Sequence, residues 1–353
     1  MSRNYRIAVI GGDGIGPEVV REGLRVLERV AAIEGFKAQP TAFPFGAEHY
    51  LKSKEIFPES AFGEVKGHDA ILLGAIGDPR IETGLLERAI IWGLRQTFDL
   101  YVNLRPIKLY SAEHCPLKNK TPADIDMIIV RENTEDAYAG LGGIHRKGTP
   151  HEVAVAEMIY TRDGVERVIR YSFDLAKRRN KGGKPKLTLV DKANAIRAQD
   201  IWTRVFAEVA REFPGVETDH AYIDAACMWM VKNPEWFDVV VTPNLFGDIL
   251  TDLGAMVQGG MGVAASGNIH PGKVSMFEPI HGSAPKYRGL NSANPLATIE
   301  AVRLLLEHVG EAAGAKRIGT AVRTTLESGR IKSLSAGAYK TTEMGDIILA
   351  ALA

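Results

Sequence analysis

Apolar residues occur in short continuous runs along the chain, and each run ends in glycine or polar residues. A run of this kind is typical of a strand buried on both faces, as in a parallel sheet covered by helices. Amphipathic stretches with helical spacing separate the runs. The pattern predicts an α/β fold with a central, largely parallel sheet. The runs that we interpret as strands are RIAVIGG, DAILLGAIG, IDMIIVREN, KLTLVDKAN, HAYIDAA and FDVVVTPN.

Polar residues follow several of these runs. In open parallel sheets, ligands bind outside the carboxyl ends of the strands. We therefore expect the functional residues at these ends. The ends read Arg131-Glu132-Asn133, Asp191-Lys192-Ala193-Asn194, Asp224 and Asn244.

The first predicted strand leads into the glycine-rich stretch GGDGIGPEVV. A dinucleotide-binding fingerprint G-x-G-x-x-G has a third glycine and an acidic residue about 20 positions later. Counted from Gly12 and Gly14, the third position is Pro17, and GFKAQPTAFPFG contains no acidic residue. The stretch predicts a tight turn between strand and helix without the ordinary Rossmann role.

The length of 353 residues is more typical of two domains than of one. Residues from about 140 to 165 begin with glycines and continue with a β-like pattern, so they predict an extended arm. We expect a turn at Asp163-Gly164 and a helix near Arg167 to Lys177. The basic run KRRNKGGKPK is interpreted as a solvated loop.

The 43 lysine and arginine residues balance the 43 aspartate and glutamate residues. This balance predicts no nucleic acid and no membrane surface as a partner. Cys115 and Cys227 are far apart and fit no metal-ligand spacing, which favours a reducing compartment. The N-terminal segment lacks an apolar core, and no stretch reaches about 18 apolar residues. We therefore expect a soluble, cytoplasmic protein.

The segment NLFGDILTDLGAM contains Asp248 and Asp252, four positions apart on a predicted helix. This spacing places both carboxylates on one face. One interpretation is a solvated face. The other is that Asp224, from another strand end, completes a set of three hard oxygen ligands for Mg²⁺ or Mn²⁺. The spacing alone leaves both interpretations open.

Three arginines, Arg95, Arg105 and Arg131, lie near predicted strand ends. Guanidinium groups bind carboxylates through two parallel hydrogen bonds, so the set suggests a small acidic substrate. Tyr138 and Lys192 are candidate proton carriers.

Several motifs together resemble the isocitrate/isopropylmalate dehydrogenase family, whose members are β-decarboxylating dehydrogenases. They occur in the family's order from Gly12 to beyond Asn294 and cover nearly the whole chain. The motifs are GDGIGPEV, LRQTFDLYVNLRP, VRENTEDAYAG, LVDKANA, YIDAACMWMV, NLFGDILTDLGA and FEPIHGSAP.

The resemblance implies a two-domain homodimer with active sites shared between subunits. Residues 1–100 and 254–353 would form a large domain on the cofactor side, and 101–253 a small domain with the dimer interface and the arm. The implied roles are malate-moiety binding by Arg95, Arg105 and Arg131, metal binding by Asp248, Asp252 and Asp224, acid chemistry by Tyr138 and base chemistry by Lys192. Lys192 and Asp224 would come from the other subunit.

The resemblance also implies a nicotinamide cofactor bound by the loop around FEPIHGSAP. NAD-dependent relatives carry aspartate after GSAP, whereas this chain has Lys286 followed by Tyr287, as in NADP-dependent isocitrate enzymes. Ala293 resembles the NAD type. We expect NAD to be used and NADP to be accepted as well. The predicted cofactor residues are Glu278, His281, Gly282, Ser283, Ala284, Lys286, Tyr287 and Asn294.

The substituent at C3 of the substrate is read in this family by the helix before Arg95. Isocitrate enzymes resemble S-x-N here, whereas this chain has Ala89 and Ile91, and Trp92 follows. Isopropylmalate enzymes usually have leucines at both positions, so the aliphatic Ile91 keeps the pocket apolar and favours 3-isopropylmalate, which is converted to 2-oxoisocaproate in leucine biosynthesis. Trp92 departs from this pattern: an indole that lines the pocket is compatible with the same substrate, whereas one that fills it favours a smaller substrate. D-malate or tartrate, and homoisocitrate, remain alternatives. A regulatory subunit without activity is disfavoured because every family catalytic position that we can match is retained.

Overall fold

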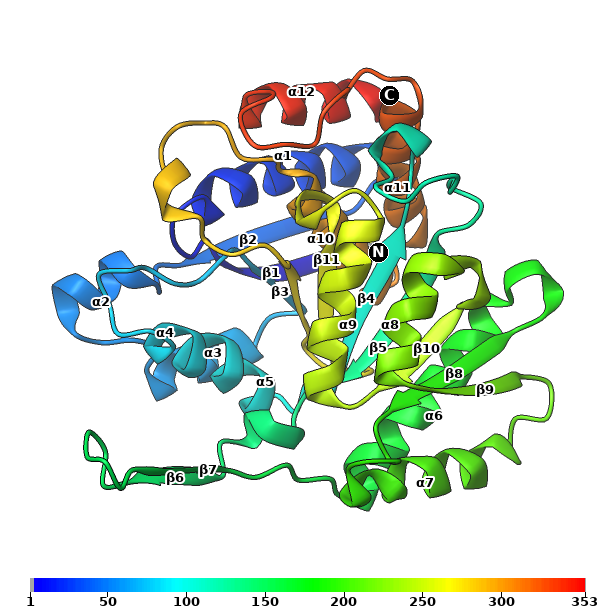
Figure 1. The fold of residues 1–353 in the computed structure, drawn as a ribbon. Coiled ribbons are helices and arrows are strands. Elements are labelled where there is room, and N and C mark those ends of the chain that lie inside the picture. The colour runs from blue at the N-terminus through cyan, green and yellow to red at the C-terminus, as the bar shows by residue number, and fades with distance from the viewer. Residues whose placement is uncertain (1–2, 353) are drawn as a thin grey trace. The chain divides into compact units, whose positions relative to one another are not determined.

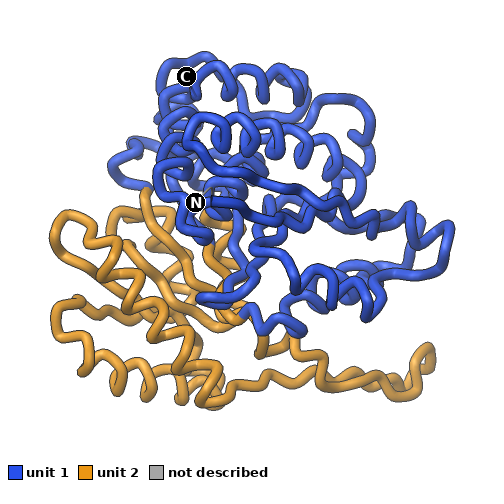
Figure 2. The backbone as a smooth tube through the Cα atoms, turned by 180° about the vertical axis from the view of Figure 1, so that it is seen from behind, with its two compact units in different colours: residues 1–100, 105–125, 255–353 blue, residues 101–104, 126–254 orange. Residues whose placement is uncertain are grey.

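The computed structural model describes residues 3–352, and the chain divides into two compact units. Unit 1 comprises residues 1–100, 105–125 and 255–353, and unit 2 comprises residues 101–104 and 126–254 (Figure 2). The small domain implied by the family resemblance contains residues 105–125, but this segment groups with unit 1. The reason is that it bonds to the chain after residue 254. The amide of Lys108 donates to Gln258 Oε1 at 2.7 Å.

Unit 1 contains strands in the order β2-β1-β3-β12-β11 (Figure 1). β1 pairs in parallel with β2 and β3, β3 with β12, and only the β11–β12 pair is antiparallel among these described strands. The strand bounds are Asn4–Ile10 for β1, Lys37–Phe43 for β2, Ala70–Leu73 for β3, Ala265–Ile269 for β11 and Met276–Pro279 for β12. β4 (Val102–Lys108) contributes residues to both units.

Helices complete unit 1. The α-helices are α1 (Gly16–Glu34), α2 (Ala47–Ser53), α3 (Glu59–Lys66), α4 (Leu85–Glu87), α5 (Gly93–Thr97), α10 (Leu296–His308), α11 (Ala312–Glu327) and α12 (Thr341–Ala351). The short helices are η1 (Arg88–Trp92), η2 (Ala112–His114), η7 (Met261–Val263) and η8 (Pro285–Tyr287). Among residues 3–352, no helix combines the length and the apolar character that crossing a membrane requires.

Unit 2 contains four strands in the order β5-β10-β8-β9, and every neighbouring pair in this group is parallel. The bounds are Asp126–Glu132 for β5, Lys186–Asp191 for β8, Glu217–Tyr222 for β9 and Val239–Thr242 for β10. The helices are η3 (Asp136–Ala139), α6 (Arg162–Arg179), η4 (Lys181–Gly183), η5 (Arg197–Gln199), α7 (Asp200–Ala210), α8 (Ile223–Lys232), η6 (Pro234–Trp236) and α9 (Asn244–Val257). The α/β class with a largely parallel sheet is thereby confirmed.

The sequence explains these elements locally. Every residue of β3 and β10 is buried, as expected for apolar strands with both faces covered. α1 buries residues at helical spacing and ends at Gly35, whose φ of 72° is the left-handed conformation that glycine adopts without strain. The turn predicted at Asp163-Gly164 is wrong, because both residues lie in the first turn of α6. Thr161 caps this helix and accepts from the amide of Gly164 at 3.0 Å.

The glycine-rich turn after β1 packs main chain against main chain. A Cβ on Gly12 would collide with the carbonyl oxygen of Ala75, and one on Gly14 with that of Ser283. The amide that follows each glycine donates to the same carbonyl oxygen: that of Asp13 to Ala75 at 2.7 Å, and that of Ile15 to Ser283 at 2.8 Å. The glycines therefore let this turn support the loop that begins at Ser283.

The arm consists of β6 (Gly142–His145) and β7 (Val153–Ala156), paired antiparallel (Figure 1). Every residue of both strands is exposed. Ile144 and Val153 keep about half of their surface accessible, 52% and 53%. Apolar side chains on a two-stranded ribbon are thus left uncovered within one chain.

Candidate active site

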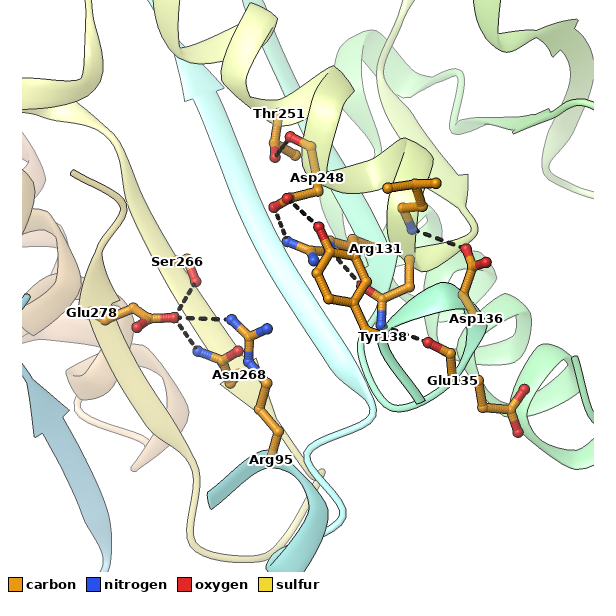
Figure 3. A network of polar contacts seen from close by, with 12 residues as sticks. Arg95, Arg131, Glu135, Asp136, Tyr138, Asp248, Thr251, Ser266, Asn268 and Glu278 are labelled. Atoms are coloured by element: carbon orange, nitrogen blue, oxygen red, sulfur yellow. Dashed lines mark hydrogen bonds and ion pairs between the residues drawn. The ribbon is translucent and has the colours of Figure 1, made fainter. Parts of the chain in front are cut away.

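In unit 2, Arg131 and Tyr138 meet at the carboxylate of Asp248 (Figure 3). The hydroxyl of Tyr138 donates to Asp248 Oδ2 at 2.6 Å, and Arg131 Nη1 forms an ion pair with Oδ1. The guanidinium carbon of Arg131 also lies 5.2 Å from the centre of the Tyr138 ring. A cation, a phenol and an anion are therefore within direct contact of one another.

Neighbouring residues fix Arg131 in place. Its side chain is 2% exposed, and its Nε donates to Asn244 Oδ1 at 2.9 Å. Asn244 is the first residue of α9, and its Nδ2 donates to the carbonyl oxygen of Glu135 at 3.1 Å. A Cβ on Gly247 would collide with the Arg131 side chain. A glycine in the first turn of α9 is what allows the arginine to lie against the helix.

Asp252 follows Asp248 by one turn of α9 and is exposed, as are Ile249 and Met256, both 54% accessible. The structure buries Leu250 on the opposite side of the helix and leaves Ile249, Asp252 and Met256 exposed. This face of α9 presents a carboxylate between two large apolar side chains.

Lys192 and Asp224 pair with each other. Lys192 Nζ lies 2.6 Å from Asp224 Oδ1, and 68% of the Asp224 side chain is exposed. The hydrogen bond from Lys192 lowers the pKa of the Asp224 carboxyl below its usual range. Asp224 is the second residue of α8. Within residues 3–352, no group of three or more histidine, cysteine, aspartate or glutamate side chains could hold a metal ion.

In unit 1, Arg95 lies against a buried carboxylate. Arg95, on α5, is 9% exposed, and its Nη2 lies 3.5 Å from Glu278 Oε1 (Figure 3). The same oxygen accepts from Asn268 Nδ2 at 2.8 Å and from Ser266 Oγ at 3.4 Å. Ser266 stands opposite Glu278 in the β11–β12 register. Arg105, on β4, is 8% exposed.

Sequence reasoning missed Ser266 and Asn268. They lie in ASGNI, whose polar composition does not signal a strand. Their function depends on pairing with β12, which no local pattern reveals.

The segment before Arg95 is not α-helical throughout. Residues Arg88–Trp92 form a π-helix, which has a wider turn than an α-helix. Ile90 is fully buried, and Ile91 packs against the core cluster of unit 1. Trp92 is half-buried. The directions in which the side chains of Ile91 and Trp92 project from the helix therefore differ from those expected in an α-helix with 3.6 residues per turn.

The predicted cofactor loop borders a cavity of about 380 Å³ in unit 1. One wall consists of residues 76–79 and 81–83 with Leu86 and Glu87, and the other of residues 282–285. His281 precedes this wall. Its Nε2 is buried and has no hydrogen-bond partner among the described residues, and burial lowers the pKa of its imidazole. A buried ring nitrogen without a partner fits a polar ligand that reaches this loop.

Hydrogen bonds between side chains and the main chain hold this loop. Glu18 accepts from the amides of Gly289 at 2.6 Å and Asn291 at 3.0 Å. Asn294, at the end of the loop, donates from Nδ2 to the carbonyl of Leu334 at 3.2 Å. The loop backbone is thus fixed by α1 and by residues near 334.

The side chains of Lys286 and Tyr287 differ in exposure. Lys286 is exposed, and its Nζ lies 4.8 Å from the centre of the half-buried Tyr287 ring. Tyr287 packs with Ala284 against a small cluster of Ile15, Val19 and Ala293.

Comparisons with known proteins identify the family of this chain. The model of the isocitrate/isopropylmalate dehydrogenase family matches residues 6–348. A 3-isopropylmalate dehydrogenase of Thermobifida fusca is 50% identical over 350 residues, which cover 98% of this chain and 97% of the relative. One of Frankia casuarinae is 53% identical over 324 residues, with 91% and 92% covered. The crystal structure of isocitrate dehydrogenase from Methylococcus capsulatus superposes with a TM-score of 0.87 at 34% identity, covering 99% of both chains.

Proposed function

Because the chain belongs to the isocitrate/isopropylmalate dehydrogenase family, we propose that it oxidises and decarboxylates 3-isopropylmalate to 2-oxoisocaproate in leucine biosynthesis. The observation that carries this proposal is the convergence of Arg131 and Tyr138 on Asp248. A carboxylate-binding cation and a proton donor beside an acidic group suit a substrate that bears a carboxylate next to the reacting carbons.

The donor set fits Mg²⁺ or Mn²⁺. Asp248 and Asp252 are carboxylates one helical turn apart, and hard oxygen ligands are those that both ions prefer. Asp224, exposed on α8, is the third proposed ligand and would come from a second subunit. When bound, the metal supplies a Lewis acid at the substrate oxygens, and a nicotinamide supplies the hydride acceptor.

Side chains of the protein would bind the substrate and transfer the protons. Arg95, Arg105 and Arg131 would bind the carboxylates of the malate moiety and orient C2 toward the cofactor. Lys192 Nζ would take the proton of the C2 hydroxyl. After carbon dioxide leaves, the Tyr138 hydroxyl would deliver a proton to C3.

NAD is the proposed cofactor, with NADP accepted in addition. The proposed contacts lie in the loop after β12, where His281 Nε2 is buried without a partner among the described residues. The residues assigned to this role are Glu278, His281, Gly282, Ser283, Ala284, Lys286, Tyr287 and Asn294. Lys286 offers a cation, and no aspartate stands in its place to repel a 2′-phosphate.

A homodimer with shared active sites is part of the proposal. Large apolar side chains are exposed near α8, including Met228 at 66% and Trp236 at 50%, and on the arm. Surfaces of this kind are typical of protein interfaces. Both cysteines are free, in keeping with a reducing cytoplasm.

The test is an assay of cofactor reduction against 3-isopropylmalate, D-malate, tartrate, isocitrate and homoisocitrate. We expect the highest kcat/KM with 3-isopropylmalate, loss of turnover on chelation, and recovery with Mg²⁺ or Mn²⁺. A higher kcat/KM with D-malate, tartrate or homoisocitrate would replace the substrate assignment. Full turnover in metal-free buffer would overturn the proposed chemistry.

A further inference from the structure

A continuous chain of hydrogen bonds runs through unit 2 from Lys192 to the first turn of α9. The amide of Lys192 donates to Gln199 Oε1 at 2.7 Å, and Gln199 Nε2 donates to the Tyr160 hydroxyl at 2.8 Å. Tyr160 in turn donates to Asp136 Oδ1 at 2.9 Å. The other oxygen of Asp136 accepts from the amide of Leu245 at 2.9 Å.

The chain is shielded from water. Gln199 is fully buried, and Asp136 is 1% exposed. Burial raises the pKa of the Tyr160 phenol, so the hydroxyl remains neutral and can donate and accept at the same time. Because water does not reach these groups, a hydrogen bond that is lost is not replaced by one to solvent. The position of each side chain therefore depends on its neighbours in the chain of hydrogen bonds.

Asp136 has a second constraint. Its φ is 70°, the left-handed region that aspartate tolerates better than most residues. Its amide donates to Ile159 at 2.9 Å, and its Oδ1 also accepts from the amide of Ala137 at 2.8 Å. Asp136 thereby fixes η3, which carries Tyr138, and the start of α9, which carries Asp248 (Figure 3).

Tyr160 is held by packing as well as by its hydroxyl. Its ring contacts Trp202 edge to face, with the centroids 6.5 Å apart. Trp202 is fully buried on α7. A phenylalanine at position 160 would keep this packing and lose only the two hydrogen bonds.

We propose that Tyr160 and Asp136 are positioning residues that align Tyr138 and Asp248 at one end of the chain and Lys192 at the other. The proposal rests on the proposed function, which assigns acid, metal-binding and base roles to these three residues. If active sites are shared between subunits, Lys192 of one subunit belongs to one active site, and Tyr138 and Asp248 of that subunit belong to the other. The buried hydrogen bonds within the subunit would then fix the positions of both groups.

The first experiment compares Tyr160→Phe with Trp202→Phe in the intact protein. Mn²⁺ affinity is measured by electron paramagnetic resonance, and thermal stability and steady-state kinetics are measured in parallel. Both variants should lower Tm. Only Tyr160→Phe should also weaken Mn²⁺ binding, by about tenfold, as is usual when a residue supporting a metal ligand is lost, and it should lower kcat more than it changes KM.

The outcomes separate the two proposals. A wild-type protein that binds no Mn²⁺ overturns the proposed function. A wild-type protein that binds Mn²⁺, with unchanged affinity and kcat in Tyr160→Phe, overturns the positioning role alone. Asp136→Gly is the companion variant, because glycine adopts the same φ without strain. If Asp136→Gly retains the wild-type Mn²⁺ affinity and kcat, the carboxylate of Asp136 has no positioning role, and only the left-handed backbone conformation at this position matters.

A second experiment separates the two ends. In a heterodimer of one Lys192→Met chain and one Tyr138→Phe chain, the first chain retains Tyr138 and the second retains Lys192. The single intact active site combines these two groups. Tyr160→Phe is added to either chain in turn. We expect kcat to fall in both heterodimers. A loss confined to one of them overturns the claim that the chain of hydrogen bonds supports both ends.

Discussion

The hydroxyl of Tyr138 donates a 2.6 Å hydrogen bond to Asp248, a carboxylate 110 residues further along the chain. Arg131 occupies the other oxygen of the same carboxylate. The hydroxyl that we propose as the proton donor is thus held in place by the protein itself, and removing it should affect the chemical step more than substrate binding.

Tyr138→Phe should lower kcat by about 10²- to 10⁴-fold, the usual contribution of a positioned acid. KM for the substrate should change little, since the arginines are untouched. Steady-state kinetics check this, with Tyr50→Phe on α2 as a control that keeps full activity. A kcat close to that of the wild type would remove Tyr138 from the acid role.

Shared active sites predict complementation. Lys192→Met and Tyr138→Phe homodimers should each be nearly inactive. Mixed dimers should regain up to about half of the wild-type activity, because one of two sites then has both groups. Activity is measured after subunit exchange, with exchange verified by mass spectrometry. Verified heterodimers without activity would indicate that both groups serve the same site from one chain.

Trp92 is predicted to limit the space for the C3 substituent. Trp92→Leu should raise the ratio of kcat/KM for 3-isopropylmalate to that for D-malate, by about 1–3 kcal/mol at most for a few methylenes. An unchanged ratio in Trp92→Leu would restrict this side chain to core packing.

Lys286 is predicted to read the ribose of the cofactor. Lys286→Asp should lower kcat/KM with NADP more than with NAD, because a carboxylate repels a 2′-phosphate and accepts hydrogen bonds from ribose hydroxyls. Lys37→Asp, an exposed change on β2, should affect neither. Equal losses with both cofactors would place the discrimination elsewhere in the loop.

His220 links stability to pH. Its Nε2 lies 3.1 Å from the fully buried Asp191, and this hydrogen bond raises the pKa of His220. Asp219 adds to this increase, although burial opposes it. A raised pKa in the folded state means that protonated His220 stabilises the fold below the unfolded-state pKa of about 6.5, and that this contribution is lost as pH rises through the folded-state pKa.

His220→Gln should therefore lower Tm more at about pH 5.5 than at about pH 9. The expected loss is about 1 kcal/mol or less, because 37% of the histidine side chain is exposed and solvent screens the pair. Thermal unfolding at both pH values measures it. An equal loss at both pH values would contradict a charged pair.

The sequence predicts well the strands that carry runs of buried apolar residues. The strand predicted at HAYIDAA is wrong beyond Tyr222, because the exposed β9 ends there and Ile223 begins α8. The runs at β1, β3, β5, β8 and β10 consist of adjacent apolar residues, and the structure has strands there. It does not predict β2, because KAQPTAF is largely exposed and contains Pro40. It also does not predict β11, whose Ser266 and Asn268 are buried only because Glu278 accepts their hydrogen bonds.

For the candidate site, the sequence predicts individual residues but not the contacts between them. Motifs point to Arg131, Tyr138 and Asp248 separately, but the spacing of residues carries no information about which oxygen each one contacts. Asp136 lies within the motif VRENTEDAYAG, but neither its supporting role nor that of Tyr160 can be predicted from the sequence, because these roles depend on a left-handed backbone conformation and on partners that are distant in the chain. The π-helix before Arg95 also lies outside any pattern based on 3.6 residues per turn.

The loop that carries Lys286 and Tyr287 is anchored through main-chain atoms: the carbonyl of Ser283 and the amides of Gly289 and Asn291. None of these bonds uses the side chains of Lys286 and Tyr287, which we propose to contact the cofactor. We therefore expect that these two side chains can be replaced one at a time while the backbone of the loop stays in place. An enzyme built in this way can change its preference between two cofactors by few substitutions, in evolution or in the laboratory, without first having to refold the loop.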